Sequence, residues 1–143
     1  MQDVNFLYEM INGLALYEKH PNDMTGSIEM LKYWLFEKNI ATAVIAEIKD
    51  QIIGYSIYYL IFSSFAANVN VYMEDLFIKP EYRGQGYEKE FFYKLSEMIK
   101  KEGYLKLEWS CLNWNASSIK FYEKIGAIQE TGRFYFEYKL KND

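Results

Sequence analysis

Residues 69–103 read VNVYMEDLFIKPEYRGQGYEKEFFYKLSEMIKKEG, and this pattern predicts a strand, a tight turn and a helix in direct succession. The strand is expected over Val69–Ile78 and the turn over Lys79–Gly86. The helix is expected to begin near Tyr87 and to end at Gly103, since glycine is common just past a helix end.

The hydrophobic rhythm of the strand changes in its middle. Val71 and Met73 occupy odd positions. Leu76 and Ile78, farther along, occupy even ones. Because side chains in a strand alternate with a period of two, the shift predicts one extra residue near Glu74–Asp75, which is a β-bulge.

Two features of this stretch suggest ligand chemistry. The carboxylates of Glu74 and Asp75 interrupt an apolar run, and Gly84 and Gly86 lie in the turn just before the helix. Glycine lets backbone N–H groups approach a ligand, and the start of a helix favours an anion. A glycine turn between a strand and a helix is also common in proteins that bind no phosphate, so the turn alone leaves both readings open.

Composition limits the classes of protein to which the chain can belong. Its 143 residues, half of them apolar and a quarter charged, suit one globular domain over residues 1–143. A formal net charge of −4 argues against nucleic acid as a partner, and no apolar run is long enough to cross a membrane. The single cysteine, Cys111, excludes an internal disulfide and fits a cytoplasmic protein. With one histidine, His20, no metal site is expected.

Helices and strands follow from periodicity. Asp3 and Asn115 are placed to cap the first and last helices. The residue patterns predict helices over 3–18, 27–37, 87–103 and 116–125, and strands over 40–48, 52–62, 69–78 and 105–112, with two final strands within 127–140.

Two motifs resemble those of the GNAT superfamily of N-acetyltransferases. Arg83–Glu88 resembles its pyrophosphate-binding turn, in which Arg and Gly86 match but Glu88 replaces a small residue. Residues 115–127, NASSIKFYEKIGA, resemble its second motif, an Asn-capped helix with Phe-Tyr and a closing Gly. The resemblance implies an α/β (α+β) fold with a mixed, mostly antiparallel sheet flanked by helices. The strand that normally precedes the first helix of this fold is missing here.

The resemblance also implies acetyl-CoA as co-substrate. It puts backbone groups of Leu76, Phe77 and Ile78 along the pantetheine arm and the acetyl group. It puts the turn on the pyrophosphate, through Arg83, Gly84, Gln85, Gly86, Tyr87, Glu88 and Lys89. A carboxylate at Glu88 repels a pyrophosphate unless it points away, although Lys89 offsets it.

The second motif contributes further cofactor contacts by the same resemblance. Asn115 falls at the pantetheine arm, and Ser117 and Ser118 fall on cofactor-binding positions. Tyr122 matches the general acid that protonates the sulfur of coenzyme A, a role that suits a phenol because it keeps its proton at neutral pH. The alternative is a capped helix whose aromatic residues belong to the core.

A closer resemblance is to the diamine (spermidine/spermine) acetyltransferases and their thialysine-acetylating relatives. It is carried by residues 16–18, 72–78 and 114–122. It implies a small cationic amine substrate, Glu74 assisting its deprotonation, and a homodimer. The amine-binding positions would be Tyr17, Glu18, Glu74, Asp75, Glu108, Trp109 and Ser110.

Alternatives stay open at this point. Glu74 and Asp75 would otherwise bond only to bulge amides or surface arginines, and Tyr17 and Glu18 would simply end a helix. The loop 63–68 lacks the acid that polyamine-specific members carry, so a thialysine-like amine is as plausible as a polyamine. Two other functional classes remain. One is a non-catalytic CoA-binding or amine-sensing module, and the other is a purely structural interaction domain.

Overall fold

The computed structural model describes residues 4–140, which fall into two compact units, one ending at Ser110 and the other beginning at Cys111. The first unit holds α1 (Val4–Tyr17), α2 (Ile28–Lys32), β1 (Thr42–Ile48), β2 (Gln51–Ser63), β3 (Asn68–Ile78), α3 (Tyr87–Lys101) and β4 (Leu107–Glu108). The second holds α4 (Ala116–Lys124). Single short helical turns lie at Pro21–Asp23, Tyr33–Glu37 and Pro80–Tyr82.

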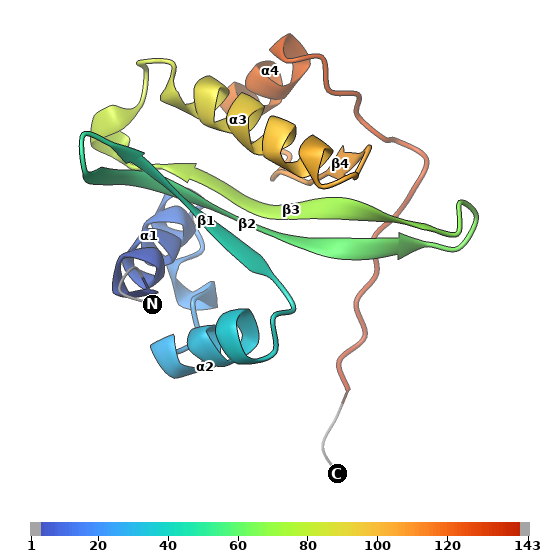
Figure 1. The fold of residues 1–143 in the computed structure, drawn as a ribbon, viewed down its shortest axis with the longest axis horizontal. Coiled ribbons are helices and arrows are strands. Elements are labelled where there is room, and N and C mark those ends of the chain that lie inside the picture. The colour runs from blue at the N-terminus through green and yellow to red at the C-terminus, as the bar shows by residue number, and fades with distance from the viewer. Residues whose placement is uncertain (1–3, 141–143) are drawn as a thin grey trace. The chain divides into compact units, whose positions relative to one another are not determined.

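One four-stranded sheet organises the first unit, in the order β1-β2-β3-β4 (Figure 1). The first two pairings are antiparallel and β4 runs parallel to β3. The expected α/β class, with a mixed and mostly antiparallel sheet, is confirmed. Among residues 4–140 no strand precedes α1, and β1 pairs only with β2.

The predicted bulge in the central strand is present. Ile57 of β2 pairs with Asp75, but the next residue, Tyr58, pairs with Met73, so Glu74 is the extra residue. The side chains on either side of it change face accordingly, as the shift in apolar positions indicated.

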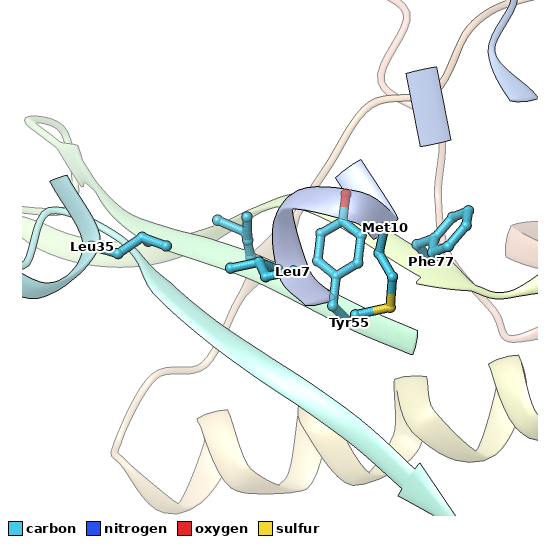
Figure 2. Close-up of a cluster of buried hydrophobic side chains, with 6 residues drawn as sticks. Leu7, Met10, Leu35, Tyr55 and Phe77 are labelled. Atoms are coloured by element: carbon cyan, nitrogen blue, oxygen red, sulfur yellow. The ribbon is translucent and has the colours of Figure 1, made fainter. Parts of the chain in front are cut away.

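The two faces of the sheet carry separate cores, with α1 and α2 on one side and α3 on the other (Figure 1). Tyr55 and Phe77 of the sheet pack with Leu7 and Met10 of α1 and with Leu35 (Figure 2). The opposite face packs Ile53 and Ile78 against Phe91 of α3. Burying these apolar surfaces is the main force that holds the helices on the sheet.

The expected helices are confirmed with small changes at their ends. Ser27 caps α2, where its Oγ accepts a hydrogen bond from the Met30 N–H at 3.2 Å. The helix then widens into the π-turn Tyr33–Glu37. The expected cap Asp3 lies outside the described residues. No helix within residues 4–140 is long and apolar enough to span a membrane.

The expected strand Leu105–Leu112 is much shorter in the structure, because only Leu107 and Glu108 pair, with Val71 and Tyr72 of β3. The extra residue at Glu74 lies two positions beyond the last paired residue, Tyr72, and a bulge locally disrupts the ladder.

The two strands expected within 127–140 are a wrong prediction. These residues have no regular secondary structure, and Phe134 and Phe136 are almost fully exposed. Alternating apolar residues specify which side chains share a face, but a strand also requires a neighbouring backbone to pair with. This segment has none among the described residues.

Candidate functional site

Three carboxylates gather at the bulge. Glu74 is the exposed extra residue, Asp75 follows it, and Glu18 comes from the chain just after α1. Burial, and after it the charge of Glu74, raise the pKa of Glu18, while His20 lowers it. Glu18, Glu74 and Asp75 therefore interact electrostatically, and these three carboxylates are here called the acid cluster.

Asp75 is the most constrained member of the acid cluster. The hydroxyl of Tyr55 donates a hydrogen bond to its Oδ2 at 2.9 Å, and Ser56 Oγ donates to its backbone carbonyl at 2.7 Å. Burial raises the pKa of Asp75 to about 6, the Tyr55 hydrogen bond lowers it, and the charges of Glu74 and Glu18 raise it. Asp75 therefore changes charge close to neutral pH.

The edge of β3 that faces away from β2 is largely unpaired. β4 reaches only Val71 and Tyr72, so within the described chain no strand lies beside Leu76, Phe77 and Ile78 on that side. This is the segment that the resemblance put along the acetyl group. Backbone groups on an unpaired edge are open to a ligand.

The turn before α3 contains two glycines with positive φ and leads into a helix start that has no side-chain cap. Gly84 and Gly86 have φ values of +77° and +87°, which other residues rarely adopt, and a Cβ at either would meet open space. Gly86 is the N-cap residue of α3 and has no side chain that could cap the helix. The first backbone N–H groups of α3 therefore donate no capping bond to it and could bind an anion.

Arg83 links this turn to α1. Its Nε donates a hydrogen bond to the Ile78 carbonyl at 2.8 Å, and its guanidinium stacks on Tyr17 and Phe77. Glu88, in the first turn of α3, is half-buried; burial raises its pKa and Arg83 lowers it. Gln85 donates to the Glu81 carbonyl at 3.3 Å, and Tyr87, Glu88 and Lys89 form the first turn of α3.

The three residues in and after β4 that were expected to bind the amine, Glu108, Trp109 and Ser110, do not all lie on the same face of the sheet. Ser110 Oγ accepts a hydrogen bond from the Tyr72 hydroxyl at 3.1 Å, and Glu108 pairs with Tyr72 in the ladder. Trp109 packs edge-on against Phe92 of α3, 5.5 Å between ring centroids. The acid cluster borders the α1 core instead, so the structure does not bring Trp109 to it.

In the second unit, Asn115 caps α4 as predicted. Its Oδ1 accepts hydrogen bonds from the Ser118 N–H and the Ser117 hydroxyl, both at 3.3 Å. Tyr122 packs against Phe121, 5.5 Å between ring centroids. Among the described residues no group of three His, Cys, Asp or Glu side chains is arranged to hold a metal.

Comparison with known proteins decides the family. The model of the acetyltransferase (GNAT) family matches residues 7–127, which spans both units. The chain belongs to the GNAT acetyltransferase family. It is 32% identical over 134 residues to the thialysine N-epsilon-acetyltransferase of Sus scrofa, covering 87% of this chain and 78% of the relative. A Caenorhabditis elegans enzyme of the same name is 30% identical over 125 residues, with 87% and 77% covered.

Solved structures agree on the GNAT fold. A possible acetyltransferase from Clostridium difficile 630 superposes with a TM-score of 0.81 at 14% identity, covering 99% of this chain and 93% of that one. An aminoglycoside acetyltransferase from an uncultured soil metagenomic sample gives a TM-score of 0.80 at 17% identity, with 98% and 91% covered. Named relatives and the family model together make this chain an acetyltransferase enzyme.

Sequence analysis missed two residues of β2 that contact β3 beside the candidate site. Tyr55 was assigned to a central strand, and nothing in its neighbours indicates a partner 20 residues away. Gly54 pairs with Ile78, and a Cβ there would collide with the Phe77 carbonyl. A glycine inside a strand often marks a close approach of another backbone, so this contact of Gly54 could have been predicted from the sequence.

Proposed function

We propose that this GNAT enzyme transfers the acetyl group of acetyl-CoA to a primary amine of a small cationic substrate, such as a thialysine-like amine, a diamine or a polyamine. Acetyl transfer itself follows from the family. The observation that carries the choice of acceptor is the acid cluster, in which the bulge brings Glu74 and Asp75 together with Glu18. Grouped carboxylates favour a protonated, positively charged ligand.

The unpaired end of β3 and the glycine turn that follows it both fit acetyl-CoA. The unpaired backbone of Leu76, Phe77 and Ile78 suits the acyl arm, and the Gly84–Gly86 turn with the uncapped start of α3 suits a pyrophosphate. When bound, acetyl-CoA supplies an activated acetyl thioester. The chain's part is to bind and orient both substrates and to move protons.

Proton transfer is assigned to two side chains. An amine attacks a carbonyl only in its neutral form, and Glu74, exposed at the bulge, is the residue that we propose accepts its proton. Tyr122, in the motif-matching helix α4, is the residue that we propose protonates the departing sulfur. Both assignments extend the sequence resemblance.

Named relatives support an amino-acid-like amine as the first substrate to try. The Sus scrofa and Caenorhabditis elegans relatives are named for thialysine. A relative from Arabidopsis thaliana, 32% identical over 74 residues that cover 52% of this chain and 32% of its own, is named an L-ornithine N5-acetyltransferase. Thialysine and ornithine each carry a flexible side-chain amine, which suits the grouped carboxylates of the acid cluster.

The test is an acetyl-CoA assay with an amine panel. Thialysine, ornithine, lysine, putrescine and spermidine are each compared with their fully N-acetylated counterparts, which have no free amine, and release of free thiol is measured. We expect thiol release with at least one free amine and none with its acetylated control. Thiol release that is the same with and without amines contradicts the proposal.

A second candidate function rests on Glu88. Its carboxylate lies in the first turn of α3, where a pyrophosphate would bind, and this favours a CoA-binding or amine-sensing module without turnover. Such a module would be stabilised by CoA against heat but would release no thiol with any amine.

Three wider assignments accompany the proposal. We propose that residues 1–143 act as a single acetyltransferase domain, since the family model spans both units. We also propose a homodimer, as the resemblance implies, which light scattering would measure. A cytoplasmic location fits a chain with a single cysteine, Cys111, which is exposed.

A further inference from the structure

Tyr55 is a fully buried tyrosine whose hydroxyl reaches the acid cluster. Its ring packs with Met10 of α1 and lies 5.7 Å from the Phe77 ring, centroid to centroid (Figure 2). A phenol placed so deep in a core needs a hydrogen-bond partner. The partner here is Oδ2 of Asp75, at 2.9 Å, rather than a backbone group.

Strand β2 holds Asp75 at two points. Besides the Tyr55 bond to its side chain, Ser56, which is also fully buried, donates to its backbone carbonyl at 2.7 Å. The register change falls at this same place, because Asp75 is the first residue after the bulge. Packing therefore fixes Tyr55, and Tyr55 and Ser56 together fix where the Asp75 carboxylate lies.

We propose that Tyr55 is a positioning residue for the acetylation reaction, holding Asp75 oriented and ionised so that its remaining carboxylate oxygen can accept a hydrogen bond from the cationic amine. This inference rests on the proposed function and adds Tyr55 to it. The hydrogen bond occupies one carboxylate oxygen and leaves the other for a ligand.

The charge state of Asp75 follows from the groups around it. Burial opposes its ionisation most strongly, and the Tyr55 hydroxyl of β2 favours ionisation; Glu74 on the same strand and Glu18 beyond α1 oppose it to a smaller extent. His20 acts on Glu18, where it lowers the pKa. The Tyr55 hydroxyl is thus the group that keeps the pKa of Asp75 near 6 rather than higher.

The experiment is Tyr55→Phe, with Tyr8→Phe as the matched control. Tyr8 lies in α1 and donates one hydroxyl hydrogen bond to the Gly26 carbonyl at 3.1 Å, outside the acid cluster. We expect Tyr55→Phe to move the midpoint of the acidic limb of kcat/KM for the amine upward by about one pH unit. Tyr8→Phe should leave that midpoint where it is in the wild type.

The readouts separate positioning from packing. Equal loss of activity at every pH, with the acidic midpoint unmoved, overturns the proposal and makes Tyr55 a structural residue. A direct titration of the Asp75 carboxyl by NMR gives the same comparison without turnover: a raised pKa in Tyr55→Phe supports the proposal and an unchanged pKa overturns it.

Two further results bear on the role of Tyr55. If Tyr55→Phe does not fold, Asp75→Asn takes its place, because its amide oxygen still accepts from Tyr55; the acidic limb near pH 6 should then disappear, and its persistence overturns the proposal. Failure of the wild type to acetylate any amine would refute the proposed function. An unmoved midpoint in an active Tyr55→Phe enzyme refutes only the role of Tyr55.

Discussion

The guanidinium carbon of Arg83 lies 4.5 Å from the centroid of the Tyr17 ring. One side chain thereby joins the glycine turn before α3 to the end of α1, the two places where the co-substrate and the amine are expected to bind. The same guanidinium lies 5.2 Å from the Phe77 ring, and its Nε is bonded to the Ile78 carbonyl. A lysine at this position would keep the charge but lose the planar stack.

Arg83→Lys should therefore weaken amine binding through the lost Tyr17 contact, in addition to any effect on acetyl-CoA through Phe77 and Ile78. A cation–π contact at a partly exposed site contributes about 0.5–1 kcal/mol, so we expect the KM for the amine to rise about two- to fivefold. The KM values for amine and acetyl-CoA are measured separately. A change confined to acetyl-CoA would mean that the Tyr17 contact has no part in amine binding.

Gly54→Ala should destabilise the fold. The new methyl group would collide with the backbone carbonyl of Phe77 and lie 2.8 Å from Ile78 Cδ1, and a backbone carbonyl in a sheet cannot move aside cheaply. Overpacking of this kind costs about 1–3 kcal/mol in the free energy of unfolding. Urea denaturation measures it, with Gly132→Ala as control because nothing lies within 4 Å of a Cβ there. Equal stability of the two variants would contradict the expected clash.

Asp75→Asn should stabilise the protein at neutral pH. The folded-state pKa of Asp75 is raised from 3.8 to about 6, so between these values the folded state holds more protons than the unfolded state. The free energy of unfolding therefore falls as pH rises through this window, by at most about 3 kcal/mol. Asparagine carries no charge to bury and still accepts from Tyr55.

The measurement is the difference in unfolding free energy between wild type and Asp75→Asn at pH 4 and at pH 7. The difference should favour the variant at pH 7 and shrink at pH 4. A variant that is less stable than the wild type at pH 7 would show that ionised Asp75 contributes to the fold.

Tyr122→Phe should lower kcat with little effect on acetyl-CoA affinity. The substitution removes the proposed proton donor to sulfur and keeps the ring that packs against Phe121. General-acid assistance contributes about 10²–10⁴-fold to a rate, so the loss should reach at least about 100-fold. Turnover and CoA binding by calorimetry are compared in the same preparation, and unchanged turnover would remove Tyr122 from the acid role.

The bulge was predictable because side chains in a strand alternate with a period of two. An inserted residue therefore moves the apolar residues from odd to even positions. This change is visible between Val71 and Met73, which precede Glu74, and Leu76 and Ile78, which follow it. The helix caps were predictable for a similar reason, since Asn115 acts on residues two and three positions away. Local chemistry of this kind is written in neighbouring residues.

Contacts between distant segments were not predictable in the same way. The Tyr55–Asp75 bond depends on the register of β2 against β3, which the bulge itself changes, and the Arg83–Tyr17 stack depends on how α1 lies on the sheet. The clean alternation of 134–140 failed for the opposite reason. The alternation predicts which side chains would share a face of a strand. It does not predict whether a second strand is present to form the backbone hydrogen bonds.

The most direct test of the acetyltransferase account is Glu74→Gln, with the exposed Glu47→Gln of β1 as control, assayed on the best amine of the panel. Losing one carboxylate of the acid cluster should reduce kcat/KM for the amine at least about tenfold, while the KM for acetyl-CoA stays within about twofold of the wild type. Glu47→Gln should match the wild type in both. If Glu74→Gln impairs amine and acetyl-CoA equally, or neither, the bulge does not form the amine site and the account is contradicted.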